Sequence, residues 1–282
     1  MSQSAELGTL REIELPQGVV RYRERGQGPP IVFVHGLLVH GDLWRKVVPE
    51  LADRFRCITP DLPLGAHELA MQPDADLTIP GIAQLIADFI VGLDLDEPAL
   101  VANDTGGAIT QLVMTQHPER IGRVVLTSCD AFENFLPLMF RPLQILAHTP
   151  WLLTAVLQAF RSRAVRQLPL GFGWLSKRGI EPEIEAGYVR SALSDAAIRR
   201  DCFKVLRDIS PKHTMEAADK LPAFDHPVLV AWSSEDRFFP PAHGRRLADL
   251  MPQARFEEIA DSYTFSAEDN PKALAGSIAA FL

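Results

Sequence analysis

Short apolar runs alternate with longer segments of helical periodicity along most of the chain. Ile31–Val34 and Ala99–Ala102 contain no polar residue, which is typical of strands buried on both faces of a parallel sheet. The pattern predicts further strands at Val19–Arg25, Cys57–Pro60, Arg123–Thr127, Pro227–Trp232 and Ala254–Ile259, and helices at Leu43–Ala52, Thr78–Leu93 and Pro271–Leu282. Val19–Arg25 alternates in polarity and is predicted to be a half-exposed edge strand. This order of elements predicts an α/β fold, with a mostly parallel central sheet flanked by helices.

The alternation stops between residues 131 and 210. This stretch is rich in Leu, Phe and Trp at helical spacings and is punctuated by Pro and Gly. We interpret it as a helical cap, residues 131–210, inserted into a core domain formed by residues 1–130 and 211–282. Its aromatic residues are expected to contribute to an apolar pocket: Phe132, Phe135, Phe140, Trp151, Phe160, Phe172 and Trp174.

The composition of the chain limits the partners, the cellular compartment and the cofactors that we expect. The chain has 282 residues, 47% of them hydrophobic, and a formal net charge of −8 with scattered basic residues, so we expect no nucleic-acid partner. The apolar stretch Asn134–Phe160 is interrupted by Arg141 and His148, so no membrane partner is expected. The N-terminus lacks a signal-peptide pattern and three cysteines fit a reducing compartment, which predicts a cytoplasmic protein. We expect no metal or other cofactor, and a homodimer is an open alternative to a monomer.

The segment Leu100–Ile109 carries the clearest chemical signal. A short apolar strand runs into small residues and then a helix, which is the pattern of a sharp strand-to-helix turn that presents one side chain clear of the sheet. That side chain is Asp104. A carboxylate in this position attacks saturated or epoxide carbon and forms an alkyl ester.

Four features in order give the chain a resemblance to the α/β-hydrolase fold family over nearly its whole length. They are His35-Gly36 after a strand, Pro60-Asp61-Leu62 after the next, the turn at Asp104, and Ser234-Glu-Asp236 after a late strand. Within the family, an Asp on the turn is similar to haloalkane dehalogenases and epoxide hydrolases, which implies a covalent ester later hydrolysed by activated water. The resemblance also implies that Asp236 is the supporting acid.

Several positions depart from those two subgroups. Thr105 stands where dehalogenases have Trp, and Leu37 stands where they often have Asn, so the usual halide cradle is missing. The resemblance implies that the backbone N–H groups of Leu37 and Thr105 are the oxyanion donors. His35 is expected to brace this loop.

The largest departure lies near the C-terminus, where Thr264 occupies the position of the family's catalytic His. Thr cannot accept a proton near neutral pH as imidazole can. A general base contributes about 10²–10⁴-fold, so ester hydrolysis should be slow unless another base acts. His67, in the loop after Cys57–Pro60, is the candidate substitute.

Three functions fit these residues. The first is a hydrolase of a small, mainly apolar epoxide, halide or ester-like electrophile, with Asp104 as nucleophile, Asp236 in support, and His67 or water in place of the missing base. Thr264 is then expected to line the site. The second is a lyase, isomerase or cyclase that uses Asp104 as a general base with a pKa raised by burial. The third is a pseudo-hydrolase that only binds a ligand.

Overall fold

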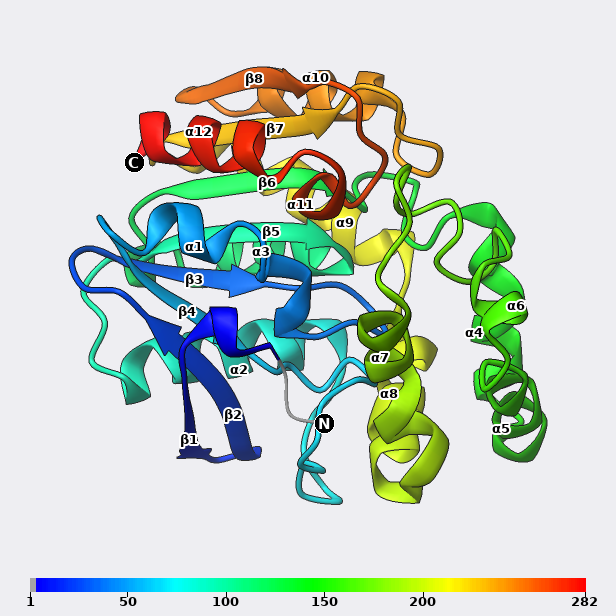
Figure 1. Ribbon diagram of the computed structural model, residues 1–282. Coiled ribbons are helices and arrows are strands. Elements are labelled where there is room, and N and C mark those ends of the chain that lie inside the picture. The colour runs from blue at the N-terminus through cyan, green and yellow to red at the C-terminus, as the bar shows by residue number, and fades with distance from the viewer. Residues whose placement is uncertain (1–3) are drawn as a thin grey trace.

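The computed structural model describes residues 4–282 and contains one eight-stranded sheet with the strand order β1-β2-β4-β3-β5-β6-β7-β8 (Figure 1). β1 and β2 pair antiparallel, β2 and β4 pair antiparallel, and every later pair is parallel. The strands are β1 (Thr9–Leu15), β2 (Gly18–Arg25), β3 (Pro30–Val34), β4 (Arg56–Pro60), β5 (Ala99–Asp104), β6 (Val124–Cys129), β7 (Val228–Ser233) and β8 (Ala254–Ile259). The predicted fold class is confirmed.

Helices cover both faces of this sheet. The helices of the core are α1 (Val48–Leu51), α2 (Ile79–Gly92), α3 (Thr105–Gln116), α9 (Pro211–Lys220), α10 (Pro241–Leu250), α11 (Ser266–Asp269) and α12 (Pro271–Phe281). α3 packs against α2 and α9, whereas α1 packs against α12 on the opposite face (Figure 1). The central strands are buried except at Pro30 and Asp104, because helices enclose them from both sides, as their apolar sequences predicted.

Two predicted elements are corrected by the structure. Val19–Arg25 is not an edge strand, because β1 pairs with it along its whole length. The continuous helix expected at Leu43–Ala52 is divided into a 3-10 helix, η2 (Gly41–Trp44), and α1. The side chain of His40 accepts a hydrogen bond from the N–H of Asp42 at the start of η2, and Pro at the beginning of α1 starts a separate helix.

Five α-helices lie between β6 and α9 in the chain. They are α4 (Arg141–Ala147), α5 (Pro150–Ala159), α6 (Arg163–Arg166), α7 (Pro182–Ser194) and α8 (Ala196–Asp208). They stand beside the carboxyl ends of the parallel strands, with α4, α5 and α6 outermost (Figure 1). In open α/β sheets ligands bind outside these strand ends, so this arrangement places the helical segment over the expected site. Within residues 4–282, no helix combines the length and the apolar character needed to cross a bilayer.

Candidate active site

Asp104 stands on a strained turn between β5 and α3. Its backbone has φ 55° and ψ −135°, a conformation that costs a non-glycine residue energy. The turn is possible because its neighbours are small. A Cβ on Gly106 would lie 2.4 Å from the His35 carbonyl oxygen, and one on Gly107 would lie 2.3 Å from Cys129 Cβ. The two glycines of the predicted turn therefore let the helix start close to the neighbouring strands.

The two oxygens of the Asp104 carboxylate have different surroundings: Thr105 binds Oδ1, and Oδ2 lies near Gly36. The Thr105 N–H donates a hydrogen bond to Asp104 Oδ1 at 2.6 Å. Oδ2 faces Gly36, where an added Cβ would come within 2.8 Å of it. Burial raises the pKa of Asp104 to about 6, the hydrogen bonds from Thr105 oppose this shift, and the nearby charge of Asp236 adds to it.

The loop after β3 is braced by His35, as predicted. His35 Nε2 accepts a hydrogen bond from the Leu62 N–H at 2.9 Å, and Nδ1 lies 2.9 Å from the Gly36 carbonyl oxygen. Burial lowers the pKa of His35 to about 3, so the ring is neutral and donates from Nδ1. Leu37 lies on this loop and lines the cavity that also contains Asp104.

Asp236 and Thr264 are in contact. The Thr264 hydroxyl donates to Asp236 Oδ1 at 3.0 Å, and this oxygen also accepts the N–H groups of Phe238 and Phe239 at 2.8 Å each. Burial raises the pKa of Asp236 to about 6, although these hydrogen bonds act in the opposite direction. The side chain that occupies the usual base position is therefore a hydrogen-bond donor to the acid.

Asp130 is a third buried carboxyl group that the sequence analysis missed. It follows β6, and the Thr105 hydroxyl lies 3.3 Å from its Oδ2 and 3.3 Å from Asp104 Oδ1. Burial and the charges of Asp104 and Asp236 raise the pKa of Asp130 well above its ordinary value. Asp130 lies at the carboxyl end of β6, the strand next to β5 and the Asp104 turn. This position was the one signal in the sequence that could have identified it.

His67 is turned to a different partner. Its Nε2 lies 3.3 Å from Asp201 Oδ2 on α8, and its Nδ1 accepts the Gly65 N–H at 3.3 Å. Asp201 Oδ2 also accepts the N–H of Met71 at 2.8 Å. His67 is buried and does not line the Asp104 cavity formed by the described residues. The structure therefore brings together Asp104, Thr105, Asp236 and Thr264, but gives His67 to a separate buried pair.

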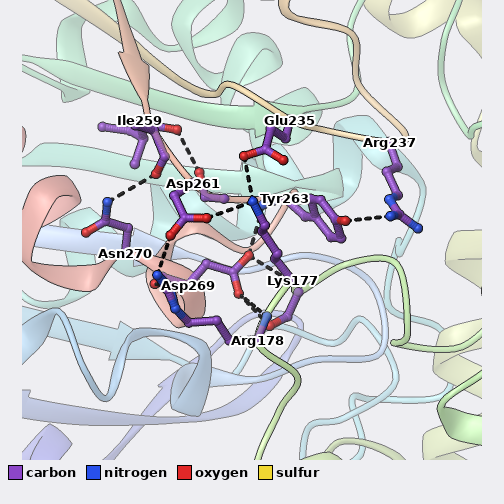
Figure 2. A network of polar contacts seen from close by, with 12 residues as sticks. Lys177, Arg178, Glu235, Arg237, Ile259, Asp261, Tyr263, Asp269 and Asn270 are labelled. Carbon is purple, nitrogen blue, oxygen red and sulfur yellow. Dashed lines mark hydrogen bonds and ion pairs between the residues drawn. The ribbon is translucent and has the colours of Figure 1, made fainter.

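The loop that carries Thr264 is fixed by a polar network (Figure 2). Lys177 Nζ lies 2.7 Å from both Glu235 and Asp261, and Asp269 Oδ2 accepts the N–H of Tyr263 at 2.9 Å. On its other side, Asn103 Nδ2 lies 2.9 Å from the Thr264 carbonyl oxygen. These contacts hold Thr264 between the residue before Asp104 and the segment that follows α6.

An apolar cavity of about 70 Å³ lies over Asp104. Among the described residues that line it, Asp104 has the only polar side chain. The lining comprises Leu37, Leu38, Asp104, Leu136, Pro137, Phe140, Leu143, Leu157, Phe160, Leu170, Gly171, Phe172, Leu175, Phe238 and Phe239. Of the aromatic residues predicted for such a pocket, Phe140, Phe160 and Phe172 line it, whereas Phe132, Phe135, Trp151 and Trp174 lie elsewhere. Residues 4–282 contain no group of three or more His, Cys, Asp or Glu side chains arranged to hold a metal ion.

Comparison with known proteins identifies the family of the chain. Residues 31–277 match the model of the alpha/beta hydrolase family. The chain belongs to this family. It is 28% identical to Haloalkane dehalogenase 2 of Mycobacterium tuberculosis over 95% of this chain and 93% of that protein. It is 26% identical to cis-3-alkyl-4-alkyloxetan-2-one decarboxylase of Xanthomonas campestris, over 97% and 96% of the two chains.

Solved structures show the same fold at lower identity. An alpha/beta hydrolase fold protein from Burkholderia ambifaria superposes with a TM-score of 0.79 at 20% identity, covering 95% of this chain and 96% of that one. A haloalkane dehalogenase from Bradyrhizobium elkani gives 0.79 at 21% identity, covering 96% of each chain. At this identity the likeness concerns the fold alone.

Proposed function

We propose that this family member is an enzyme that acts on a small, mainly apolar electrophile, with the Asp104 carboxylate as the nucleophile. The observation that carries the proposal is the isolated carboxylate in the cavity. An apolar wall holds an alkyl substrate, and the single polar group of the described lining is the one that can react. The Thr105 N–H holds Oδ1, which leaves Oδ2 to attack carbon.

The names of two relatives support this class of substrate. One is called a haloalkane dehalogenase and the other a decarboxylase of an oxetan-2-one that carries two alkyl groups. Both names describe molecules in which an electrophilic carbon is surrounded by alkyl chains. For this chain we extend the class to alkyl halides, epoxides and four-membered lactones.

The surroundings of Asp104 favour a reaction that ends without water. Thr264 donates to Asp236 and cannot activate water, and His67 is paired with Asp201. An alkyl ester on Asp104 would therefore be hydrolysed slowly. A substrate whose own electron pair breaks the ester bond to Asp104 would regenerate the free carboxylate without a general base.

A four-membered lactone meets this requirement. Asp104 attacks the saturated ring carbon that is bonded to the ring oxygen. The bond between this carbon and the ring oxygen breaks, and its electron pair stays on the oxygen, which becomes part of a carboxylate on the substrate. The bond from the substrate to this carboxylate then breaks, and its electron pair forms an alkene. The ester bond to Asp104 breaks at the same time, so carbon dioxide leaves and the Asp104 carboxylate is restored. No water and no external proton are consumed.

Intact-protein mass spectrometry with a substrate panel tests the proposal. The panel contains a dialkyl oxetan-2-one, an epoxide and a primary alkyl halide, with Asp104→Asn as the control. We expect alkene and carbon dioxide from the lactone, and a persistent adduct on Asp104 from the epoxide and the halide. Neither adduct nor turnover with any panel member, or equal adducts in Asp104→Asn, would refute the nucleophile.

A second candidate is supported by the raised pKa of Asp104, which is about 6. A carboxyl group with this pKa exchanges protons readily near neutral pH and could act as a general base in an isomerisation, elimination or cyclisation. Its activity would rise with pH through one transition near 6 and would leave no ester. An adduct formed and consumed during normal turnover would contradict this candidate.

A further inference from the structure

The outer helices of the helical segment and the residues beside them expose large apolar side chains. Six of the nine exposed large hydrophobic side chains within residues 4–282 fall between residues 134 and 180. Five of them form what we call the outer apolar patch: Leu138, Ile145, Trp151, Leu168 and Leu170. Leu138, Ile145 and Trp151 are 74%, 73% and 73% exposed, so these side chains are largely in water. Helices α4 and α5, which carry Ile145 and Trp151, pack against each other in the outermost layer of the molecule (Figure 1).

Helix α5 is apolar on both sides, although it lies at the surface. Its sequence, Pro150–Ala159, contains no charged residue. Leu153 and Leu157 are buried on the inner side, and Trp151 projects into solvent on the other. A helix that is apolar all round is ordinarily covered by protein or lipid. The outer side of α5 therefore lacks a cover in the isolated chain.

The positive charge around the patch indicates a negatively charged binding partner. Residues 134–180 contain six Arg and Lys residues and no Asp or Glu, in a chain whose formal net charge is −8. Arg141, Arg161 and Arg163 are exposed and form no ion pair with any of residues 4–282. Arg141 and Ile145 are one helical turn apart on α4, so a positive charge and an exposed apolar side chain share one face. Basic residues that flank exposed Trp and Leu are typical of helices that lie on anionic lipid.

The patch is continuous with the cavity over Asp104. Leu170 belongs to the patch and also lines the cavity. Pro137 and Phe140, on either side of exposed Leu138 in the chain, are cavity residues as well. A molecule dissolved in lipid beneath the patch would reach the apolar cavity without crossing water.

We propose that the outer apolar patch docks on the surface of an anionic lipid bilayer and that the cavity opens onto that surface. This differs from the sequence-based expectation of no membrane partner, which considered spanning segments alone. Docking of this kind needs only a partly inserted helical face. The proposal does not depend on the chemistry of Asp104, so Asp104→Asn should bind vesicles as the wild-type protein does.

Vesicle flotation tests the docking. The wild-type chain is mixed with vesicles of phosphatidylcholine alone or of phosphatidylcholine with phosphatidylglycerol, at low and high salt. We expect binding to the anionic vesicles that weakens with salt. The double variant Ile145→Ser/Trp151→Ser should bind at least about tenfold more weakly, since it removes exposed apolar area. Val91→Ser, which changes an exposed apolar residue of α2 outside the patch, should bind as the wild type does.

A second pair of variants tests the charge. Arg141→Gln/Arg161→Gln/Arg163→Gln should lower affinity for anionic vesicles by roughly fivefold for each charge, about 10²-fold in total. Lys272→Gln on α12 is the matched control and should have no such effect. Equal binding of neutral and anionic vesicles, or an unchanged triple variant, would overturn the assignment to anionic lipid.

Fluorescence locates the contact on the protein. Trp44 and Trp232 are buried, so a blue shift of emission on vesicle binding comes from an exposed Trp. Trp151→Phe should keep binding and lose the larger part of the shift. Absence of vesicle binding would overturn the proposal, and sedimentation equilibrium then decides the alternative. A wild-type dimer that Ile145→Ser/Trp151→Ser dissociates would assign the patch to a second copy of the chain.

Discussion

Replacing Thr264 by His would place an imidazole on a residue whose hydroxyl already lies 3.0 Å from Asp236 Oδ1. Under the proposed function, Asp104 as nucleophile and Asp236 as supporting acid lie near a side chain that cannot accept a proton near neutral pH. Asn103, the residue before Asp104, contacts the Thr264 carbonyl oxygen, so the backbone that carries the substituted side chain lies next to the Asp104 turn. The imidazole would gain Asp236 as its partner and could activate water against an ester on Asp104.

The expected size of the effect follows from the function of a general base. An Asp104 ester that persists in the wild-type protein should disappear about 10²–10⁴ times faster in Thr264→His. The adduct is formed with an alkyl halide, excess reagent is removed, and its decay is followed by intact-protein mass spectrometry. Hydrolysis in heavy-oxygen water should leave one labelled oxygen in Asp104 or in the released alcohol, according to which bond breaks.

Two variants separate catalysis from disturbance of the loop. Thr264→His/Asp236→Asn should lose most of the gain, because the imidazole then lacks its carboxylate. Thr264→Ala should leave the adduct as long-lived as in the wild type. Thr264 is fully buried, so the larger side chain costs about 1–3 kcal/mol by overpacking, and a thermal melt confirms folding first. A folded Thr264→His protein that keeps the wild-type adduct lifetime would refute the assignment of this position to the missing base.

Three further substitutions test the site and its support. The pKa of Asp104 is raised from 3.8 to about 6, so the stability contributed by its bound proton is present below about pH 4 and lost as the pH rises through 6. Asp104→Asn should therefore increase the free energy of unfolding near pH 8 by at most about 3 kcal/mol and change it little near pH 4, as urea titrations would measure. Gly36→Ala places a Cβ 2.6 Å from Asp104 Cβ and should lower the rate of adduct formation at least about tenfold; an unchanged rate would show that the loop yields. His35→Ala leaves the Leu62 N–H without its acceptor and should cost about 1–3 kcal/mol in chemical unfolding, whereas wild-type stability would contradict the bracing contact.

The buried strands were predictable because both of their faces are covered. Apolar runs such as Ile31–Val34 have few alternatives to a central parallel strand. β1 was missed because most of its side chains are exposed and three of them are charged, so no hydrophobic pattern marks it. It is held by backbone pairing to β2, which local side-chain periodicity does not report.

The residues of the site also fall into some that the sequence could predict and others that it could not. Asp104 ends β5 and Asp236 follows β7, and the carboxyl ends of such parallel strands meet at one edge of the sheet. Asp130 obeys this rule too, but it adjoins the segment interpreted as a cap, so the sequence pattern marks it only as the end of the core segment. The partner of His67 could not be predicted, because Asp201 comes from α8, more than one hundred residues later. Contacts of this kind depend on how the helical segment packs over the sheet.

The grouping of Asp104, Asp130 and Asp236 offers a way to search for substrates without knowing the product. The charge of Asp236 raises the pKa of Asp104, and both groups have a pKa of about 6, so the unreacted site holds two mutually repelling charges above about pH 6. An ester on Asp104 is neutral and removes one of these charges. Compounds that react should therefore raise the melting temperature of the protein near pH 8. A library of electrophiles could be ranked by dye-based melting curves, with chemical identification reserved for the compounds that shift the curve.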